Sequence, residues 1–111
     1  MTRINLTVKD FEGQILKDQV GSIAVLFKAE WCPFCRAFIP IFETLQEAGV
    51  PSALIDLNEF DNPLWDTFNI DIVPTVLLFK DGKIVQRYDG VPGEGLNAAT
   101  VGEIISYLKP Y

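Results

Sequence analysis

Short apolar runs recur along the chain at positions expected for the strands of a central sheet. Residues 4–6 alternate between apolar and polar side chains, which is typical of a short strand. Ser22–Lys28 and residues 53–57 are almost continuously apolar, as in strands that are covered on both faces. The pattern therefore predicts three strands, two of them central.

The segment after the first strand has the signature of a helix N-terminus. Thr7 is followed three residues later by Asp10, which resembles a reciprocal N-cap. Apolar residues follow at Phe11, Ile15 and Leu16, with a spacing that suits one face of a helix. We therefore predict a helix between the first two strands.

A longer helix is predicted to begin at Pro33, because apolar residues recur at helical spacing from there until Gly49. These apolar residues are Cys35, Phe38, Ile41, Phe42, Leu45 and Ala48. Farther on, Asp61 or Asn62 before Pro63 marks the start of another helix.

The last third of the chain predicts a hairpin and a closing helix. Thr75–Lys80 and residues 83–88 are strand-like and flank Asp81-Gly82, a strong signal for a two-residue turn between antiparallel strands. Residues 97–108 have helical spacing. Strands that alternate with helices and then end in a hairpin predict an α/β fold with a mixed central sheet flanked by helices on both faces, formed by residues 1–111 as one domain.

Charge and hydropathy narrow the possible partners. The formal net charge is -6, which disfavours binding to nucleic acid or to an anionic membrane surface. The apolar stretches are too short to span a bilayer, and the first residues lack the apolar region of a signal peptide. We expect a cytoplasmic monomer with no nucleic-acid or membrane partner.

The two cysteines lie three residues apart at the predicted helix start. Cys32 would face free backbone N–H groups and the positive end of the helix dipole, which favour a thiolate. Cys35 would lie on the same face, one turn deeper and within disulfide reach. The spacing predicts that Cys32 is an exposed nucleophile and that Cys35 is a shielded resolving thiol.

Other interpretations of the pair are half a zinc site, a structural disulfide or two buried core thiols. Zinc needs four ligands and the chain has no histidine, so a metal site would need carboxylates or a second chain. The context of strand, Cys-x-x-Cys and helix favours a redox pair. We therefore expect no metal, and no cofactor beyond the redox-active disulfide of Cys32 and Cys35.

Several motifs in order resemble the thioredoxin family. Residues 29–36, Ala-Glu-Trp-Cys-Pro-Phe-Cys-Arg, are similar to the active-site segment of thioredoxins. Val73-Pro74-Thr75 resembles their cis-proline loop, and the likeness continues through residues 79–82 to Gly90. The resemblance thus covers nearly the whole chain.

This resemblance implies a thiol–disulfide oxidoreductase that reduces protein disulfides and receives electrons from a thioredoxin-reductase-like partner. Pro74 would have a cis peptide bond and pack against the sulfurs. The backbone of Val73 would pair with an extended substrate segment. Trp31 and Gly90 would complete an apolar platform around Cys32.

The chain departs from the family at the residues that usually assist the buried thiol. Leu26 stands where thioredoxins usually have a buried Asp, and Leu54 aligns with its lysine partner. Lys28 replaces an aromatic residue, and it is either a candidate for lowering a thiol pKa or a charge that reaches solvent. Glu30 is an alternative base for the proton of the resolving thiol.

The dipeptide between the cysteines also differs from the usual Gly-Pro. Pro33 lacks an N–H, and Pro33-Phe34 therefore changes the donors around Cys32 and tunes its chemistry. The same Cys-Pro start occurs in glutaredoxins, which leaves a glutathione-coupled enzyme as an alternative. A non-catalytic protein, either a metal-binding dimer or an adaptor that uses Trp31 and Pro74, is the third hypothesis.

Overall fold

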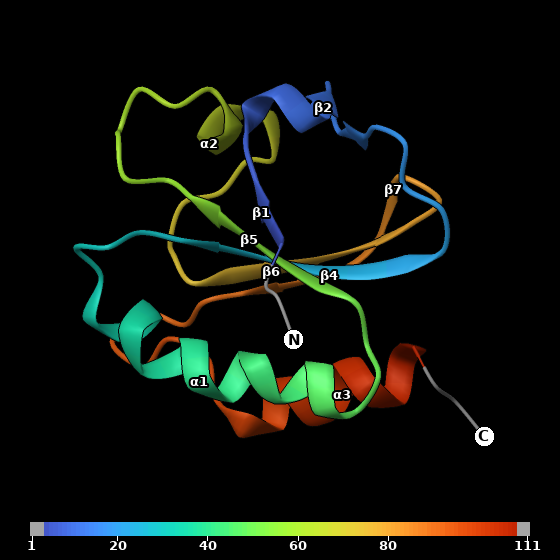
Figure 1. Ribbon diagram of the computed structural model, residues 1–111. Coiled ribbons are helices and arrows are strands. Elements are labelled where there is room, and N and C mark those ends of the chain that lie inside the picture. The colour runs from blue at the N-terminus through green and yellow to red at the C-terminus, as the bar shows by residue number, and fades with distance from the viewer. Residues whose placement is uncertain (1–3, 109–111) are drawn as a thin grey trace.

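A five-stranded mixed sheet forms the centre of the computed structural model, which describes residues 4–108 (Figure 1). Its strands are β1 (Ile4–Leu6), β4 (Ser22–Lys28), β5 (Ser52–Asp56), β6 (Thr75–Lys80) and β7 (Lys83–Asp89). The spatial order is β1-β5-β4-β6-β7. The first three strands in this order are parallel, and β6 and β7 run antiparallel to their neighbours.

Helices cover both faces of the sheet, which confirms the predicted fold class. Helices α1 (Pro33–Glu47) and α3 (Ala98–Leu108) lie together below the sheet in Figure 1, and α2 (Leu64–Thr67) lies above it. Strand alternation divides the core accordingly. Leu26 of β4 packs in the cluster on the α1 side, whereas Phe27 packs with Phe68 in the cluster on the α2 side.

The predicted helix after β1 is wrong beyond its first turn. Thr7 and Asp10 do form the predicted reciprocal cap, but the 3-10 helix η1 ends after Val8–Asp10. The chain then forms a small hairpin of β2 (Phe11–Glu12) and β3 (Ile15–Leu16). Phe11 and Leu16 are opposite each other in this hairpin and both are buried. Their spacing suits one face of a helix, but here the two side chains meet because the chain reverses direction between them.

The predicted hairpin between the last two strands is confirmed. Asp81 and Gly82 form its turn with φ angles of 51° and 88°, the left-handed backbone that a two-residue turn of this kind requires. Strand β4 and the start of α1 also lie where the sequence predicted them. The segment between β4 and α1 leaves the sheet at the carboxyl end of a central strand, and it carries the cysteines.

Candidate active site

Cys32 is the N-cap residue of α1, and its sulfur is tied to the first turn of that helix. The backbone N–H of Cys35 donates to the Cys32 Sγ over 3.1 Å. Pro33 follows as the first helical residue, where a missing N–H costs no intrahelical hydrogen bond. The local sequence thus fixes one sulfur in front of the helix N-terminus, where backbone donors and the helix dipole favour negative charge.

The free protein buries Cys32, and the predicted exposed sulfur is therefore wrong. Only 4% of the residue is exposed. The Cys32 Sγ lies 3.5 Å from the backbone carbonyl oxygen of Val73, which accepts a hydrogen bond from the thiol. The loop before β6 therefore lies against this sulfur and leaves little of Cys32 accessible.

Cys35 is fully buried, as predicted. Burial raises the pKa of the Cys35 thiol above its ordinary value of 9.0, to about 12, and the hydrogen bond with Cys32 acts in the same direction. A hydrogen bond from the Ala29 backbone and the positive charge of Lys28 oppose this increase in pKa. The two cysteines therefore differ in environment, and Cys35 holds its proton in the dithiol form.

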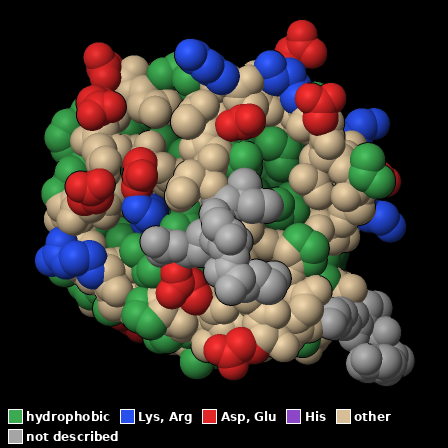
Figure 2. Space-filling model, in the orientation of Figure 1, with side chains coloured by type: hydrophobic (Ala, Val, Ile, Leu, Met, Phe, Trp, Pro, Cys, Tyr) green, Lys and Arg blue, Asp and Glu red, His purple; other side chains and the backbone are tan. Residues whose placement is uncertain are grey.

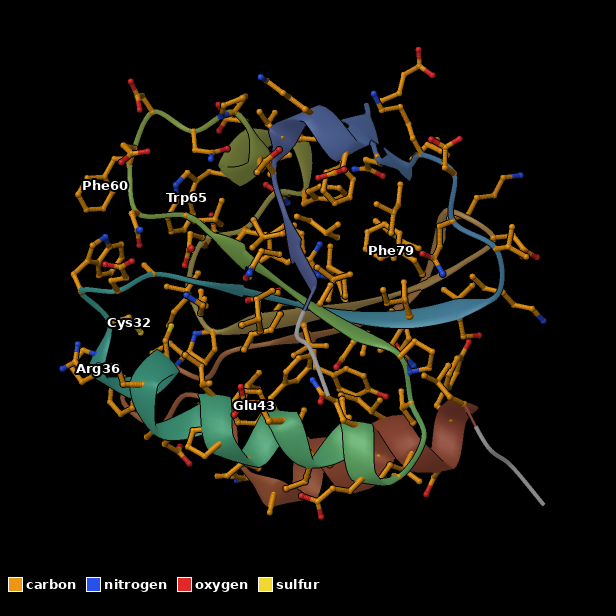
Figure 3. The ribbon with its side chains drawn as sticks, viewed as in Figure 1. Cys32, Arg36, Glu43, Phe60, Trp65 and Phe79 are labelled. Atoms are coloured by element: carbon orange, nitrogen blue, oxygen red, sulfur yellow. The ribbon has the colours of Figure 1, made fainter. Side chains whose placement is uncertain are left out.

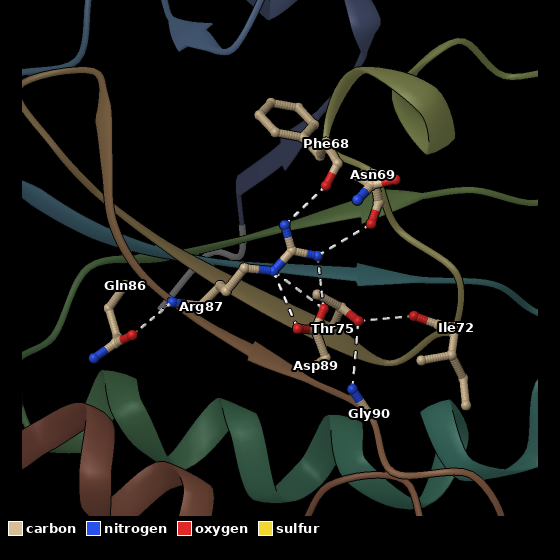
Figure 4. Close-up of polar contacts among 8 residues, drawn as sticks. All are labelled: Phe68, Asn69, Ile72, Thr75, Gln86, Arg87, Asp89 and Gly90. Atoms are coloured by element: carbon tan, nitrogen blue, oxygen red, sulfur yellow. Dashed lines mark hydrogen bonds and ion pairs between the residues drawn. The ribbon is translucent and has the colours of Figure 1, made fainter.

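The Val73–Pro74 peptide bond is cis. Gly90, at the end of β7, packs directly on this loop, because a Cβ atom built on Gly90 would lie 2.4 Å from the Pro74 carbonyl oxygen. The Gly90 N–H donates to the Thr75 hydroxyl, and that hydroxyl donates to the carbonyl of Ile72 (Figure 4). Val73, Pro74 and Gly90 are all buried, so they form the floor of the site.

Exposed apolar side chains lie on Cys32's own segment and on loops that contact it. Trp31 is 47% exposed and stacks on Phe60, which is 80% exposed, with ring centroids 5.3 Å apart. Phe34 is exposed and packs against Gly95, and Val91, which pairs with Gly95, is also exposed. Figure 3 shows Cys32 and Phe60 at the same end of the molecule. The outer part of the predicted platform therefore consists of aromatic side chains.

The loop after β5 and the first turn of α1 hold these residues in place through contacts that no sequence motif predicts. The Trp31 Nε1–H donates to the Asn58 carbonyl over 3.0 Å, and the Glu30 N–H donates to the Asn58 Oδ1 over 2.7 Å. The Arg36 guanidinium donates to the Glu30 carbonyl over 2.8 Å. Glu30 therefore contributes to the site through its backbone N–H and carbonyl groups. Asn58 and Phe60 follow no periodic pattern that could have revealed them.

Charged residues at the end of β4 take a different arrangement from the one usual in thioredoxins. Leu26 is fully buried and lies opposite Leu54 in the β4–β5 register, so this pair is apolar. Two residues farther on, Lys28 and Asp56 are opposite each other and form an ion pair. The Lys28 side chain is 12% exposed, whereas that of Asp56 is 45% exposed. Lys28 is therefore a paired charge and does not extend freely into solvent.

Arg87 of β7 binds the segment that leads into the cis-proline loop. Its guanidinium donates to the carbonyl oxygens of Phe68 and Asn69 and forms an ion pair with Asp89 (Figure 4). A pocket of about 490 Å³ lies beside it, between this segment and the end of β7. The contacts connect β7 to the backbone that precedes Val73.

No group of three His, Cys, Asp or Glu side chains in residues 4–108 lies close enough together to hold a metal ion. None of the helices described has the length and apolar character needed to cross a membrane. On the face shown in Figure 2, acidic side chains are spread among fewer basic ones.

The fold and the site together define a class of protein. A Cys-x-x-Cys pair at the start of a helix, opposite a cis-proline loop and on a mixed sheet, is the arrangement of a thioredoxin-fold thiol–disulfide oxidoreductase. The thioredoxin family model matches residues 2–101. The chain belongs to the thioredoxin family.

Individual relatives agree with this assignment. Thioredoxin from Chlamydia caviae is 41% identical over 73 residues, which is 64% of this chain and 71% of the relative. Thioredoxin C-2 from Corynebacterium nephridii is 31% identical over 94% of this chain and 97% of its own length. The crystal structure of thioredoxin f2 from Chlamydomonas reinhardtii has the same fold, with a TM-score of 0.76, 18% identity and 99% coverage of both chains.

Membership of the family settles the type of chemistry. The protein is a thiol–disulfide oxidoreductase that carries the Cys-x-x-Cys motif. Thioredoxins need no cofactor besides the redox-active cysteines, and they typically act on disulfide-bonded proteins together with a thioredoxin reductase.

Proposed function

We propose that this protein is a protein-disulfide reductase in which Cys32 attacks and Cys35 resolves. The single observation that carries the proposal is the asymmetry of the two sulfurs. The Cys32 sulfur receives an N–H donor at a helix N-terminus, whereas burial keeps the Cys35 thiol protonated. One sulfur is thus prepared to form a thiolate while the other is held in reserve behind it.

In the first step, the Cys32 thiolate attacks one sulfur of a substrate disulfide. A mixed disulfide forms, and the second substrate sulfur leaves as a thiolate. In the second step, the Cys35 thiol loses its proton and its sulfur attacks Cys32 Sγ. The disulfide between Cys32 and Cys35 forms, and the bond between Cys32 and the substrate breaks. The remaining substrate sulfur leaves as a thiolate and takes up a proton from solvent, which balances the proton that Cys35 lost.

The substrate would bind over the aromatic surface of Trp31, Phe34 and Phe60. The carbonyl of Val73 accepts a hydrogen bond from Cys32 in the free protein, and it becomes available to an extended substrate backbone once Cys32 has reacted. Pro74 and Gly90 support this backbone from below. The small exposed fraction of Cys32 would favour disulfides in extended, accessible segments.

We further propose that a thioredoxin-reductase-like donor returns the protein to the dithiol form in a reducing compartment such as the cytosol. The dithiol form of Cys32 and Cys35 is the form that donates electrons, and a reducing compartment keeps such thiols free. Pro33, Phe34 and Glu30 would influence the reactivity of Cys32 only indirectly, because they shape the first helical turn and the segment before it.

Insulin reduction with dithiothreitol tests the proposed function. We predict that the wild-type protein accelerates insulin precipitation and that Cys32→Ser abolishes the acceleration, because no thiolate can attack. Cys35→Ser should instead accumulate a mixed disulfide between Cys32 and insulin, visible by mass spectrometry. Full activity of Cys32→Ser, or an adduct on Cys35 in the wild type, would remove Cys32 from its role.

A further inference from the structure

We propose that the surface beside Cys32 selects disulfides whose cysteine is flanked by arginine or lysine, and that the stacked Trp31–Phe60 pair determines this preference. The inference rests on the proposed function, and it names the class of substrate that the same site takes. The partner is a protein whose disulfide lies in an extended, accessible segment, with basic side chains within a few residues of the reacting cysteine.

Phe60 is an aromatic side chain that the fold leaves exposed although it already has a stacking partner. It is 80% exposed, while its ring centroid lies 5.3 Å from that of Trp31. The hydrogen bond from the Trp31 Nε1–H to the Asn58 carbonyl holds Trp31 against the loop that carries Phe60. Most of the Phe60 ring is therefore free to contact another group, and removing this apolar surface from water is favourable.

Trp31 brings the stacked pair within reach of a substrate that reacts at Cys32. It directly precedes Cys32 in the chain, and Figure 3 shows Cys32 and Phe60 at the same end of the molecule. We expect the substrate backbone to lie along the Val73 carbonyl, and an extended segment rises about 3.3 Å per residue. Side chains within about two or three residues of the reacting cysteine therefore cover the neighbourhood of Cys32 that includes Trp31.

The charge of the surrounding segments decides which substrate side chain the stacked pair favours. Exposed carboxylates lie in each of the segments that form the site: before Trp31, on both sides of Phe60, before the cis-proline loop and in the loop that contacts Phe34. These carboxylates belong to Glu30, Glu59, Asp61, Asp71 and Glu94. Within residues 4–108, the ion pairs are formed by other acidic residues, Asp56 and Asp89. The carboxylates around the site are therefore available to a partner.

The basic residues of these segments leave the negative charge beside Phe60 in place. Lys28 is paired with Asp56 across the β4–β5 register. Arg36 donates to the Glu30 carbonyl, and in Figure 3 it lies on the other side of Cys32 from Phe60. A cationic substrate side chain therefore meets carboxylates around the stacked pair, and it can lie on the ring face of Phe60 in a cation–π contact. A substrate carboxylate in the same place would be repelled.

Reduction of three matched peptide disulfides tests this preference. Each substrate is a symmetrical dimer of an extended peptide with one cysteine, which is flanked by arginines, glutamines or glutamates. One reduced protein molecule converts a dimer into two peptide thiols and forms its own Cys32–Cys35 disulfide. Each rate is divided by the rate with dithiothreitol, which also attacks as a thiolate and so corrects for the intrinsic reactivity of the peptide.

We predict that the arginine dimer reacts about tenfold faster than the glutamate dimer at low ionic strength, because cation–π and charge contacts act together. Salt at about 1 M should remove most of the difference, since the Debye length is then about 3 Å.

Variants separate the stacked pair and its carboxylates from the net charge of the protein. The double variant Glu59→Gln with Asp61→Asn should lower the ratio of arginine to glutamate rates about threefold. The double variant Asp18→Asn with Glu47→Gln makes the same change in charge before the amino end of β4 and at the last residue of α1, and it should keep the ratio. Phe60→Leu should slow reduction of the arginine dimer about threefold, whereas Phe60→Tyr should retain the rate.

The outcomes are separable from those of the proposed function. Equal normalised rates for the three dimers, or an equal fall of the ratio in both double variants, would overturn the preference for basic segments while leaving Cys32 and Cys35 in place. An unchanged rate with the arginine dimer in Phe60→Leu would overturn the role of the stacked pair. Failure of the wild-type protein to reduce any of the dimers would instead contradict the proposed function itself.

Discussion

At the scale of single residues, the absence of a side chain at Gly90 lets β7 pack closely against the cis-proline loop, where we propose that the substrate binds. A side chain at this position would require the Pro74 carbonyl to move, because the two would otherwise lie 2.4 Å apart. The Pro74 carbonyl belongs to the same loop that supplies the Val73 carbonyl to Cys32. A single methyl group on residue 90 would therefore displace the loop backbone and disturb its hydrogen bond with Cys32.

We predict that Gly90→Ala destabilises the protein by about 1–3 kcal/mol, as for overpacking of a buried position. It should also raise the KM for insulin, because the loop that contacts the substrate shifts. Urea unfolding and steady-state reduction assays measure the two effects. Gly102→Ala is the matched control: beyond its chain neighbours and the nearby backbone of its own helix, no atom lies within 4 Å of the added methyl group, and a helical alanine should be neutral or stabilising by about 0.5–1 kcal/mol. Equal effects of both variants would contradict this view of Gly90.

At the scale of elements, β7 positions the cis-proline loop through Arg87. The guanidinium donates to Phe68 and Asn69 carbonyls, which lie just before the segment that leads to Val73 (Figure 4). The carboxylate of Asp89, on the same strand, fixes the guanidinium by accepting three hydrogen bonds, two from Nε and one from Nη2. Arg87 therefore ties β7 to the segment that leads into the cis-proline loop.

We predict that Arg87→Met lowers the free energy of unfolding by about 1–3 kcal/mol, because two backbone carbonyls lose a charged donor. The KM for insulin should rise more than kcat falls, since the loop loses its anchor while both cysteines keep theirs. Lys83→Met removes a charge from the exposed start of the same strand and should change neither quantity. A fall in kcat alone would show that Arg87 does not act through the loop.

The elements differ in how far the sequence could predict them. Ser22–Lys28 and the helix from Pro33 were predictable because apolar periodicity and the Cys-Pro start agree. The hairpin of Phe11 and Leu16 was not, because those two residues meet across strands while their spacing also suits a helix. The same limit hid the contact of Lys28 with Asp56, since a cross-strand pair depends on the register of two distant segments.

The candidate site divides in the same way. Cys32, Cys35 and the Val73–Pro74 loop lie in local motifs that the sequence exposes directly. The burial of Cys32 depends on a carbonyl 41 residues away in the chain, and local sequence carries no signal for it. Phe60 and Arg87 act through tertiary packing, so they became visible only in the folded molecule.

At the scale of the whole molecule, the buried thiol links redox state to stability. The folded protein raises the pKa of Cys35 from 9.0 to about 12, so folding retains a proton that the unfolded chain loses above pH 9. The contribution of this thiol to stability is therefore complete below pH 9.0 and is lost as the pH rises toward 12. The oxidised protein has no such proton to lose.

We predict that the free energy of unfolding of the reduced protein falls more steeply above pH 9 than that of Cys35→Ala. The additional slope is at most about 1.4 kcal/mol per pH unit, the value for one proton. Urea unfolding of both proteins under reducing conditions at a series of alkaline pH values measures this slope. Tyr88, whose pKa is also raised by burial, titrates in both proteins and cancels in the comparison. Parallel curves would mean that Cys35 titrates alike in the folded and unfolded states, which contradicts a thiol held protonated in the core.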